Sequence, residues 1–217
     1  MKIITQEIFD PCFKQKKVRV FMRRLDLIPS KISGNKFFKL KYNIEYAIKS
    51  KYRSIVTFGG AYSNHILATS IISKENNINC IAYIRGEESL PLNPTLNDAI
   101  NNGMEIKYIT RSDYKKIKNE DYLNVLVEDY KNSYILPEGG TNSLAIKGTE
   151  SILKPDEKFE YVCCPIGTGG TISGIINSSN QNQKIIGFPA LKGVRQIKDE
   201  IHFYTNKNNW IVNEDYC

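Results

Sequence analysis

The sequence predicts an α/β fold built from open, mostly parallel sheets. The main observation is a unit made of a strand-like apolar run, a glycine turn and a helix-like segment. It occurs at 54–60, 133–140 and 161–170, with a helix-like segment after each. Strands that alternate with helices at this spacing are typical of parallel pairing. At 217 residues, the chain is long enough for one large domain or two small ones.

Further elements are expected between these units. Two strand-like runs and the helix between them are expected at 79–85, 104–110 and 94–102. A polar helix is expected over 112–131, because Tyr122, Leu126 and Tyr130 recur every four residues. The alternation of strands and helices therefore extends over most of the chain.

A helix is also expected over 37–49, where apolar residues form one continuous stripe. The stripe consists of Phe37, Leu40, Ile44, Ala47 and Ile48. Residues 33–35 precede the helix as loop or capping residues. Lys36 and Lys39 then share one flank of its first turn, where two cations oppose the helix macrodipole. An anion held nearby would offset that cost.

The turn GTGGT predicts a phosphate site. It comprises Gly167, Thr168, Gly169, Gly170 and Thr171. A strand that ends in a glycine cluster and opens a helix presents free backbone N–H groups to an anion, and the helix dipole favours phosphate. The turn lacks the Lys-Ser/Thr of a P-loop, and Ile172 stands where the dinucleotide pattern requires glycine. A phosphate monoester is therefore the expected ligand, and a nucleotide-dependent oxidoreductase is disfavoured.

The segment AYSNH at 61–65 opens the helix that follows the first glycine turn. Ser63, Asn64 and His65 lie where free N–H groups could hold a carboxylate. An ordinary Ser/Asn cap followed by a surface histidine is the alternative. A serine nucleophile activated by His65 is disfavoured, because no GxSxG turn and no partner acid accompany it.

Lys36 stands in SGNKFFKL, before two phenylalanines and at a helix start. Burial keeps a lysine amine partly neutral, and a neutral amine can form an imine with an aldehyde cofactor. Lys36 is therefore a candidate for covalent cofactor attachment, although a lone loop lysine is usually a surface residue.

Four motifs occur in the order GNKxxKL, FGGxxSNH, PEGGTN and GTGGT. Through these motifs the chain resembles the D-cysteine desulfhydrase and 1-aminocyclopropane-1-carboxylate deaminase family over about 18–217. The members of that family are pyridoxal-phosphate enzymes of the tryptophan-synthase-β-like fold. The resemblance implies two domains with the cofactor between them. The smaller would span 41–148. The larger would combine 1–40 with 149–217 and be incomplete, with clear strands only near 18–24, 161–166 and 184–188.

The resemblance also implies a role for each site residue. Lys36 would hold pyridoxal 5'-phosphate as an imine, and Lys39 with the turn at 167–171 would bind the phosphate. Asn64 would bond the phenolic oxygen of the cofactor. Ser63 would act in catalysis and, with Asn64 and His65, meet the substrate. Histidine after the Ser-Asn pair is typical of desulfhydrase-like members, whereas the ring-opening deaminases typically have glutamine there.

The implied activity is that of a lyase or deaminase acting on a small amino acid. For D-cysteine the reaction would be a β-elimination, and for the cyclopropane substrate a ring opening. Family members run further and place a tyrosine over the active site, and the group facing the pyridine nitrogen, beyond Cys217. A truncated cofactor-binding remnant with weak or no activity is the alternative.

Composition disfavours several other classes of protein. No apolar run approaches a membrane span of about 18 residues, and the first ten residues, MKIITQEIFD, lack a signal region, so a cytoplasmic protein is expected. Five cysteines without CxxC spacing and two histidines predict no metal site. The net charge of +7 comes from basic residues that are scattered along the chain, so no nucleic-acid partner is expected. A homodimer is left open.

Overall fold

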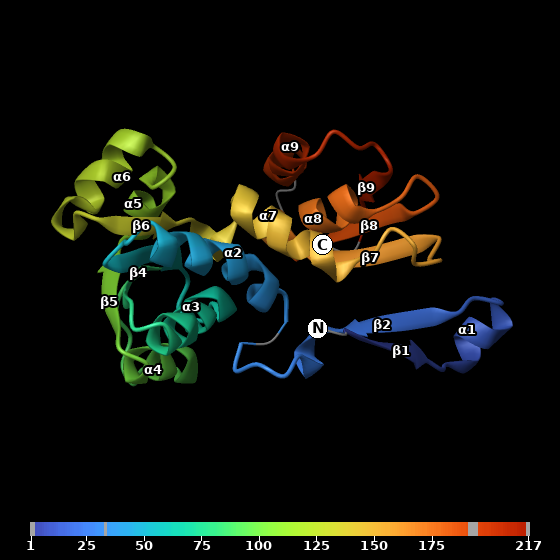
Figure 1. The fold of residues 1–217 in the computed structure, drawn as a ribbon, viewed down its shortest axis with the longest axis horizontal. Coiled ribbons are helices and arrows are strands. Elements are labelled where there is room, and N and C mark those ends of the chain that lie inside the picture. The colour runs from blue at the N-terminus through green and yellow to red at the C-terminus, as the bar shows by residue number, and fades with distance from the viewer. Residues whose placement is uncertain (1–2, 33, 191–194, 216–217) are drawn as a thin grey trace.

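The computed structural model describes residues 3–32, 34–190 and 195–215, and Ser33 and Cys217 lie outside them. The predicted α/β class with parallel sheets is confirmed (Figure 1). The strands of the described residues are β1 Ile4–Ile8, β2 Val20–Arg24, β3 Ser54–Gly59, β4 Asn79–Arg85, β5 Met104–Ile109, β6 Ser133–Leu136, β7 Tyr161–Ile166, β8 Lys184–Pro189 and β9 Trp210–Val212. The α-helices are α1 Pro11–Gln15, α2 Asn35–Lys49, α3 Asn64–Glu75, α4 Pro94–Asn101, α5 Arg111–Lys116, α6 Glu120–Leu126, α7 Ser143–Thr149, α8 Gly170–Ser178 and α9 Arg195–Tyr204.

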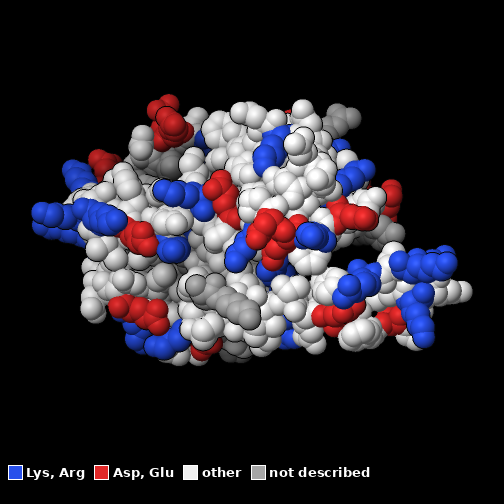
Figure 2. Space-filling view, turned by 45° about the vertical axis from the view of Figure 1, so that its right-hand side comes forward, with Lys and Arg blue, Asp and Glu red and all other residues white. Residues whose placement is uncertain are grey.

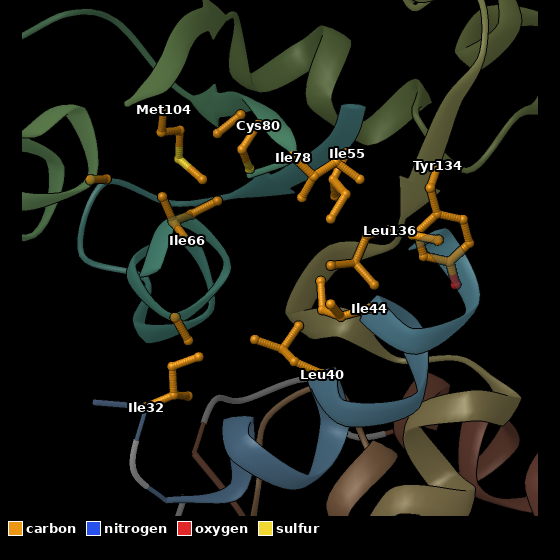
Figure 3. Packing of buried hydrophobic residues seen from close by; sticks show 14 of the residues in the cluster. Ile32, Leu40, Ile44, Ile55, Ile66, Ile78, Cys80, Met104, Tyr134 and Leu136 are labelled. Carbon is orange, nitrogen blue, oxygen red and sulfur yellow. The ribbon is translucent and has the colours of Figure 1, made fainter. Parts of the chain in front are cut away.

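A four-stranded parallel sheet in the order β5-β4-β3-β6 forms the larger of the two parallel layers. Every residue of β3 is buried, because helices cover both faces of this central strand. On one face Ile55, Ile66 and Leu136 pack with Leu40 and Ile44 of α2 (Figure 3). The opposite face packs against α5 and α6.

A second parallel sheet has the order β7-β8-β9. Its buried side packs on α8 and α9 through Cys164, Ile185, Ile176 and Ile201. Helix α2 packs on α7, and α7 packs on α8, so these three helices lie between the two parallel sheets (Figure 1). The division at 41–148 that we propose would separate the two sheets, although its boundaries fall inside α2 and α7.

Two expectations about secondary structure were wrong. The strand near 18–24 does not join the second sheet, because β2 pairs antiparallel with β1 in a separate two-stranded sheet. The single helix expected over 112–131 is instead α5, α6 and a 3-10 turn at Glu128–Tyr130. The break arises because the side chain of Asn119 accepts a hydrogen bond from the backbone N–H of Tyr122 and so starts a new helix.

The molecular surface carries charges of both signs. On the face in Figure 2, lysine and arginine are interspersed with aspartate and glutamate. Within the described part of the chain, no helix combines the length and the apolar composition that crossing a membrane requires.

Candidate cofactor and substrate site

The predicted site residues lie at helix starts and turns that follow the carboxyl ends of parallel strands. The turn 60–63 follows β3, the turn 137–142 follows β6, and the turn 167–169 follows β7. The start of α2 faces two of these turns, since Lys39 bonds to Thr141 and to Thr168. The fold therefore brings together motifs that are far apart in the sequence.

Lys39 is the most deeply buried cation of the site, with 1% of its surface exposed. Its Nζ lies 2.7 Å from Thr141 Oγ1 and 3.2 Å from Thr168 Oγ1. Among the residues that the structure describes, no carboxylate lies within ion-pair distance of it. Burial, and secondly the charge of Lys36, hold the pKa of Lys39 well below its ordinary value.

The hydrogen-bond donors around Lys39 outnumber the acceptors. When Lys39 is protonated, the form that a nearby anion favours, its ammonium group and two threonine hydroxyls supply five protons. The bonds from Lys39 to the two hydroxyls, and the 2.5 Å bond between Thr141 Oγ1 and Thr168 Oγ1, use three of them. Two donors are left for a ligand acceptor. This cluster of Lys39, Thr141 and Thr168, here called the anion cluster, suits a group with several oxygens and a negative charge.

The start of α8 adds backbone donors to the anion cluster. Gly169 is the N-cap residue, with a left-handed φ of 80°, and no side chain caps the helix. Its first N–H groups therefore remain free for an anion. A Cβ on Gly170 would lie 3.0 Å from Lys39 Nζ and from Thr141 Oγ1, so glycine at this position gives the cluster its space.

Lys36 lies one helical turn before Lys39 and is half-buried. Its Nζ lies 3.4 Å from Asn35 Oδ1, and Asn35 Nδ2 donates to Thr171 Oγ1 at 2.8 Å. Burial lowers the pKa of Lys36. A lowered pKa increases the fraction of neutral amine, which is the form that condenses with an aldehyde.

The AYSNH segment divides into an accessible part and a buried part. Ser63 is the half-buried N-cap of α3, and its Oγ accepts the backbone N–H of His65 at 3.2 Å. Asn64 is exposed, and its side chain makes no hydrogen bond to another described residue. His65 is 1% exposed, so the surface-histidine alternative is wrong.

Consecutive contacts connect His65 to the anion cluster. A Cβ on Gly140 would lie 3.1 Å from His65 Cε1, and a Cβ on Gly139 would lie 2.7 Å from Thr168 Oγ1. The two glycines, both with left-handed φ, thus fit between His65 and Thr168. The ring of His65 and Thr168 of the anion cluster therefore lie on either side of this glycine pair.

Sequence reasoning missed Asn35, Thr57 and Thr141. Thr141 directly follows the double glycine of PEGGTN, and that placement after a turn is the one signal that marked it. Asn35 was read as a loop residue and is the first residue of α2. Thr57 is fully buried inside β3 and had no signal in the sequence.

Proteins of similar sequence have names from one enzyme group. A Thermotoga maritima protein provisionally named a 1-aminocyclopropane-1-carboxylate deaminase is 32% identical over 164 residues, which are 72% of this chain and 52% of that protein. The mitochondrial bifunctional D-cysteine desulfhydrase/1-aminocyclopropane-1-carboxylate deaminase of Arabidopsis thaliana is 31% identical over 175 residues, 72% of this chain and 44% of its own. The chain spans about half the length of these curated relatives. No protein-family model matches the chain.

Solved structures support the fold. A crystal structure of an ACC deaminase homologue superposes with a TM-score of 0.74 at 22% identity, covering 93% of this chain and 66% of that one. A serine racemase from Dictyostelium discoideum superposes with a TM-score of 0.66 at 18% identity, covering 94% and 65%. At these identities the likeness shows the fold alone.

Proposed function

The chain belongs by sequence and fold to the D-cysteine desulfhydrase and 1-aminocyclopropane-1-carboxylate deaminase family of pyridoxal-phosphate enzymes, and from this premise we propose that it binds pyridoxal 5'-phosphate and acts on a small amino acid as a lyase or deaminase. The observation that carries the proposal is the anion cluster beside Lys36. A buried cation without a carboxylate needs an anion, and a half-buried amine lies one turn away from it.

The residues present fit pyridoxal 5'-phosphate. Lys39, Thr168 and the first N–H groups of α8 would hold its phosphate, and glycine at position 170 leaves the room that the Lys39 and Thr141 side chains occupy beside it. Thr141 would orient the Lys39 ammonium toward that phosphate. When bound, the cofactor supplies an electron sink for the charge that develops at the substrate α-carbon.

Lys36 is the residue that would hold the cofactor aldehyde. Burial lowers its pKa and so increases the fraction of neutral amine, the form that would condense with the aldehyde and that can accept a proton. Asn35 helps to fix its position, because the Asn35 side chain is itself held by Thr171 in the phosphate turn. One turn of α2 would thus serve both ends of the cofactor.

Ser63 and Asn64 form the substrate side of the proposal. The N–H groups at the start of α3 that Ser63 does not cap suit a carboxylate. The Asn64 side chain, which bonds to no other described residue, is available to the cofactor's phenolic oxygen. A small amino acid would dock here with its carboxylate at the helix start. D-cysteine and the cyclopropane amino acid are the two substrates that the relatives' names suggest.

Reductive trapping tests the cofactor assignment. Borohydride reduction of the protein with pyridoxal phosphate, followed by peptide mapping, should place the label on Lys36. Lys36→Ala should abolish that label, and Lys41→Ala, at an exposed lysine of the same helix, should retain it. Labelling confined to other lysines in the unsubstituted protein would disprove the assignment.

A substrate assay then tests the reaction. Sulfide release from D-cysteine and 2-oxobutyrate release from 1-aminocyclopropane-1-carboxylate should be measured side by side. Ser63→Ala should reduce whichever turnover the parent protein shows more than it reduces cofactor affinity. Full turnover in that variant would show that Ser63 is not part of the substrate site.

A further inference from the structure

A buried hydrogen-bond chain runs from His65 through Thr57 to Leu136. Thr57 lies in the middle of β3 and is fully buried. Its Oγ1 lies 2.7 Å from His65 Nε2 in α3 and 3.0 Å from the carbonyl oxygen of Leu136 at the end of β6. The chain therefore joins three elements behind the candidate site.

The inventory of protons sets the direction of this chain. The Leu136 carbonyl can only accept, so the single hydroxyl proton of Thr57 goes to it. Thr57 Oγ1 must then accept from His65, which places the ring proton on Nε2. His65 Nδ1 is left as a buried acceptor with no partner in the described part of the protein.

The ring of His65 lies against the glycine pair that faces the anion cluster. A Cβ added to Gly140 would lie 3.1 Å from His65 Cε1, and one added to Gly139 would lie 2.7 Å from Thr168 Oγ1, so neither position has room for a side chain. A shift of the ring would therefore move the glycine pair relative to Thr168. Since the interior is close-packed, such a shift is transmitted rather than absorbed.

We propose that Thr57 and His65 are positioning residues that hold the turn Glu138–Gly140 in register with the phosphate turn, acting through Gly139 and Gly140 and not through contact with the substrate. The expected effect of this positioning on cofactor affinity rests on the proposed function, whereas the hydrogen-bond chain itself is independent of that function. A glutamine amide at position 65 would also offer an N–H donor to Thr57, so what position 65 must supply is a donor at its tip.

The first test is independent of any cofactor. The chain has two histidines, His65 and His202, so ¹⁵N-histidine labelling with a His202→Gln variant assigns both rings. His65 should show a neutral ring protonated at Nε2, with a proton that exchanges slowly. A ring protonated at Nδ1, or a fast-exchanging Nε2 proton, would overturn the hydrogen-bond chain.

The second test compares two buried threonines. Thr57→Val breaks the hydrogen-bond chain without a change of shape, whereas Thr69→Val removes a hydroxyl whose hydrogen bond among the described residues stays within α3, to the carbonyl of His65. In the protein without cofactor, Thr57→Val should shift the amide resonances of Gly139, Gly140 and Thr168, and Thr69→Val should leave them in place. Equal shifts in the two variants would overturn the positioning role.

The third test measures the consequence for ligand binding. Thr57→Val should weaken pyridoxal-phosphate binding about 10-fold or more, the effect of one unmet buried hydrogen bond near the site. Thr57→Ser keeps the hydroxyl and His65→Gln keeps the donor, so each variant should retain the parent affinity and the parent visible spectrum. Unchanged affinity in Thr57→Val would contradict the proposal, whereas failure of the parent protein to bind the cofactor would refute the proposed function alone.

Discussion

At the scale of single residues, Lys39 combines deep burial with an uncompensated positive charge. Protein interiors accept an ammonium group only when other charges or many hydrogen bonds compensate its lost hydration. Two threonine hydroxyls satisfy part of its hydrogen bonding, but none of its charge. Lys39 therefore costs stability in the empty protein, and an anion bound beside it would offset that cost.

Lys39→Met should consequently have opposite effects on binding and on stability. Loss of a charge-assisted hydrogen bond should weaken pyridoxal-phosphate binding about 10- to 100-fold. Removal of a buried unpaired cation should raise the free energy of unfolding of the cofactor-free protein by about 1 kcal/mol or more. Urea denaturation and cofactor titration measure the two effects. Lys41→Met, at an exposed lysine, is the control and should change neither.

His65 makes the second residue-scale prediction, which concerns pH. Burial first, and then the charges of Lys36 and Lys39, hold its pKa well below the ordinary value of 6.5. As the pH falls below 6.5, the unfolded chain binds a proton at His65 that the folded chain does not. The free energy of unfolding should therefore fall with decreasing pH, by up to about 1.4 kcal/mol per pH unit from this group.

Urea denaturation between pH 7 and pH 5 isolates that contribution. His65→Gln should flatten the pH dependence relative to the parent protein, because glutamine does not titrate. His202→Gln, at the exposed histidine, provides the matched comparison. Identical slopes for the parent and His65→Gln would mean that His65 titrates alike in the folded and unfolded chains.

Sequence patterns marked the residues of the candidate site that belong to local motifs. Lys36, Lys39 and the phosphate turn could be predicted, because glycines, a helix start and a strand end occur within a few positions of one another. Thr141 could not be assigned a role, since its partners Lys39 and Thr168 lie 102 and 27 residues away. The burial of His65 depends likewise on the packing of three elements.

At the scale of elements, the same rule decides which strands and helices were predictable. The apolar runs that became β3, β4 and β5 are long enough to be recognised by composition. Strand β9 has three residues and forms only because β8 pairs with it, so no local signal marked it. The antiparallel partner of β2 is β1, a polar strand that lacks an apolar pattern.

Close helix packing gives the element-scale prediction. A Cβ on Gly148 would lie 2.0 Å from the carbonyl oxygen of Phe38, where α7 meets α2, and one on Gly174 would lie 2.0 Å from Thr149 Oγ1, where α8 meets α7. Gly148→Ala and Gly174→Ala should each lower the free energy of unfolding by about 1–3 kcal/mol through overpacking. Gly167→Ala is the control, because nothing lies within 4 Å of the added Cβ.

At the scale of the whole molecule, the anion cluster lies between the two parallel sheets. Lys39 comes from α2, Thr141 from the turn after β6, and Thr168 from the turn after β7. A ligand held by all three would connect the four-stranded sheet to the three-stranded sheet. Its binding energy should therefore stabilise both sheets together.

Ligand-dependent unfolding tests that connection. The single tryptophan, Trp210, lies in β9 and reports on the three-stranded sheet, while far-ultraviolet circular dichroism reports on all elements. Pyridoxal phosphate at about 100 times its dissociation constant should add about 2.7 kcal/mol to the free energy of unfolding. It should shift the transitions seen by both probes equally.

Two simpler ligands show which part of the cofactor makes the connection. Inorganic phosphate should produce a smaller shift of the same kind, because the anion cluster spans both sheets by itself. Pyridoxal without its phosphate should shift the transitions least, since it leaves Lys39 without an anion. If pyridoxal stabilises the protein as strongly as pyridoxal phosphate does, the binding energy comes from the aldehyde and ring, and the anion cluster does not hold the phosphate.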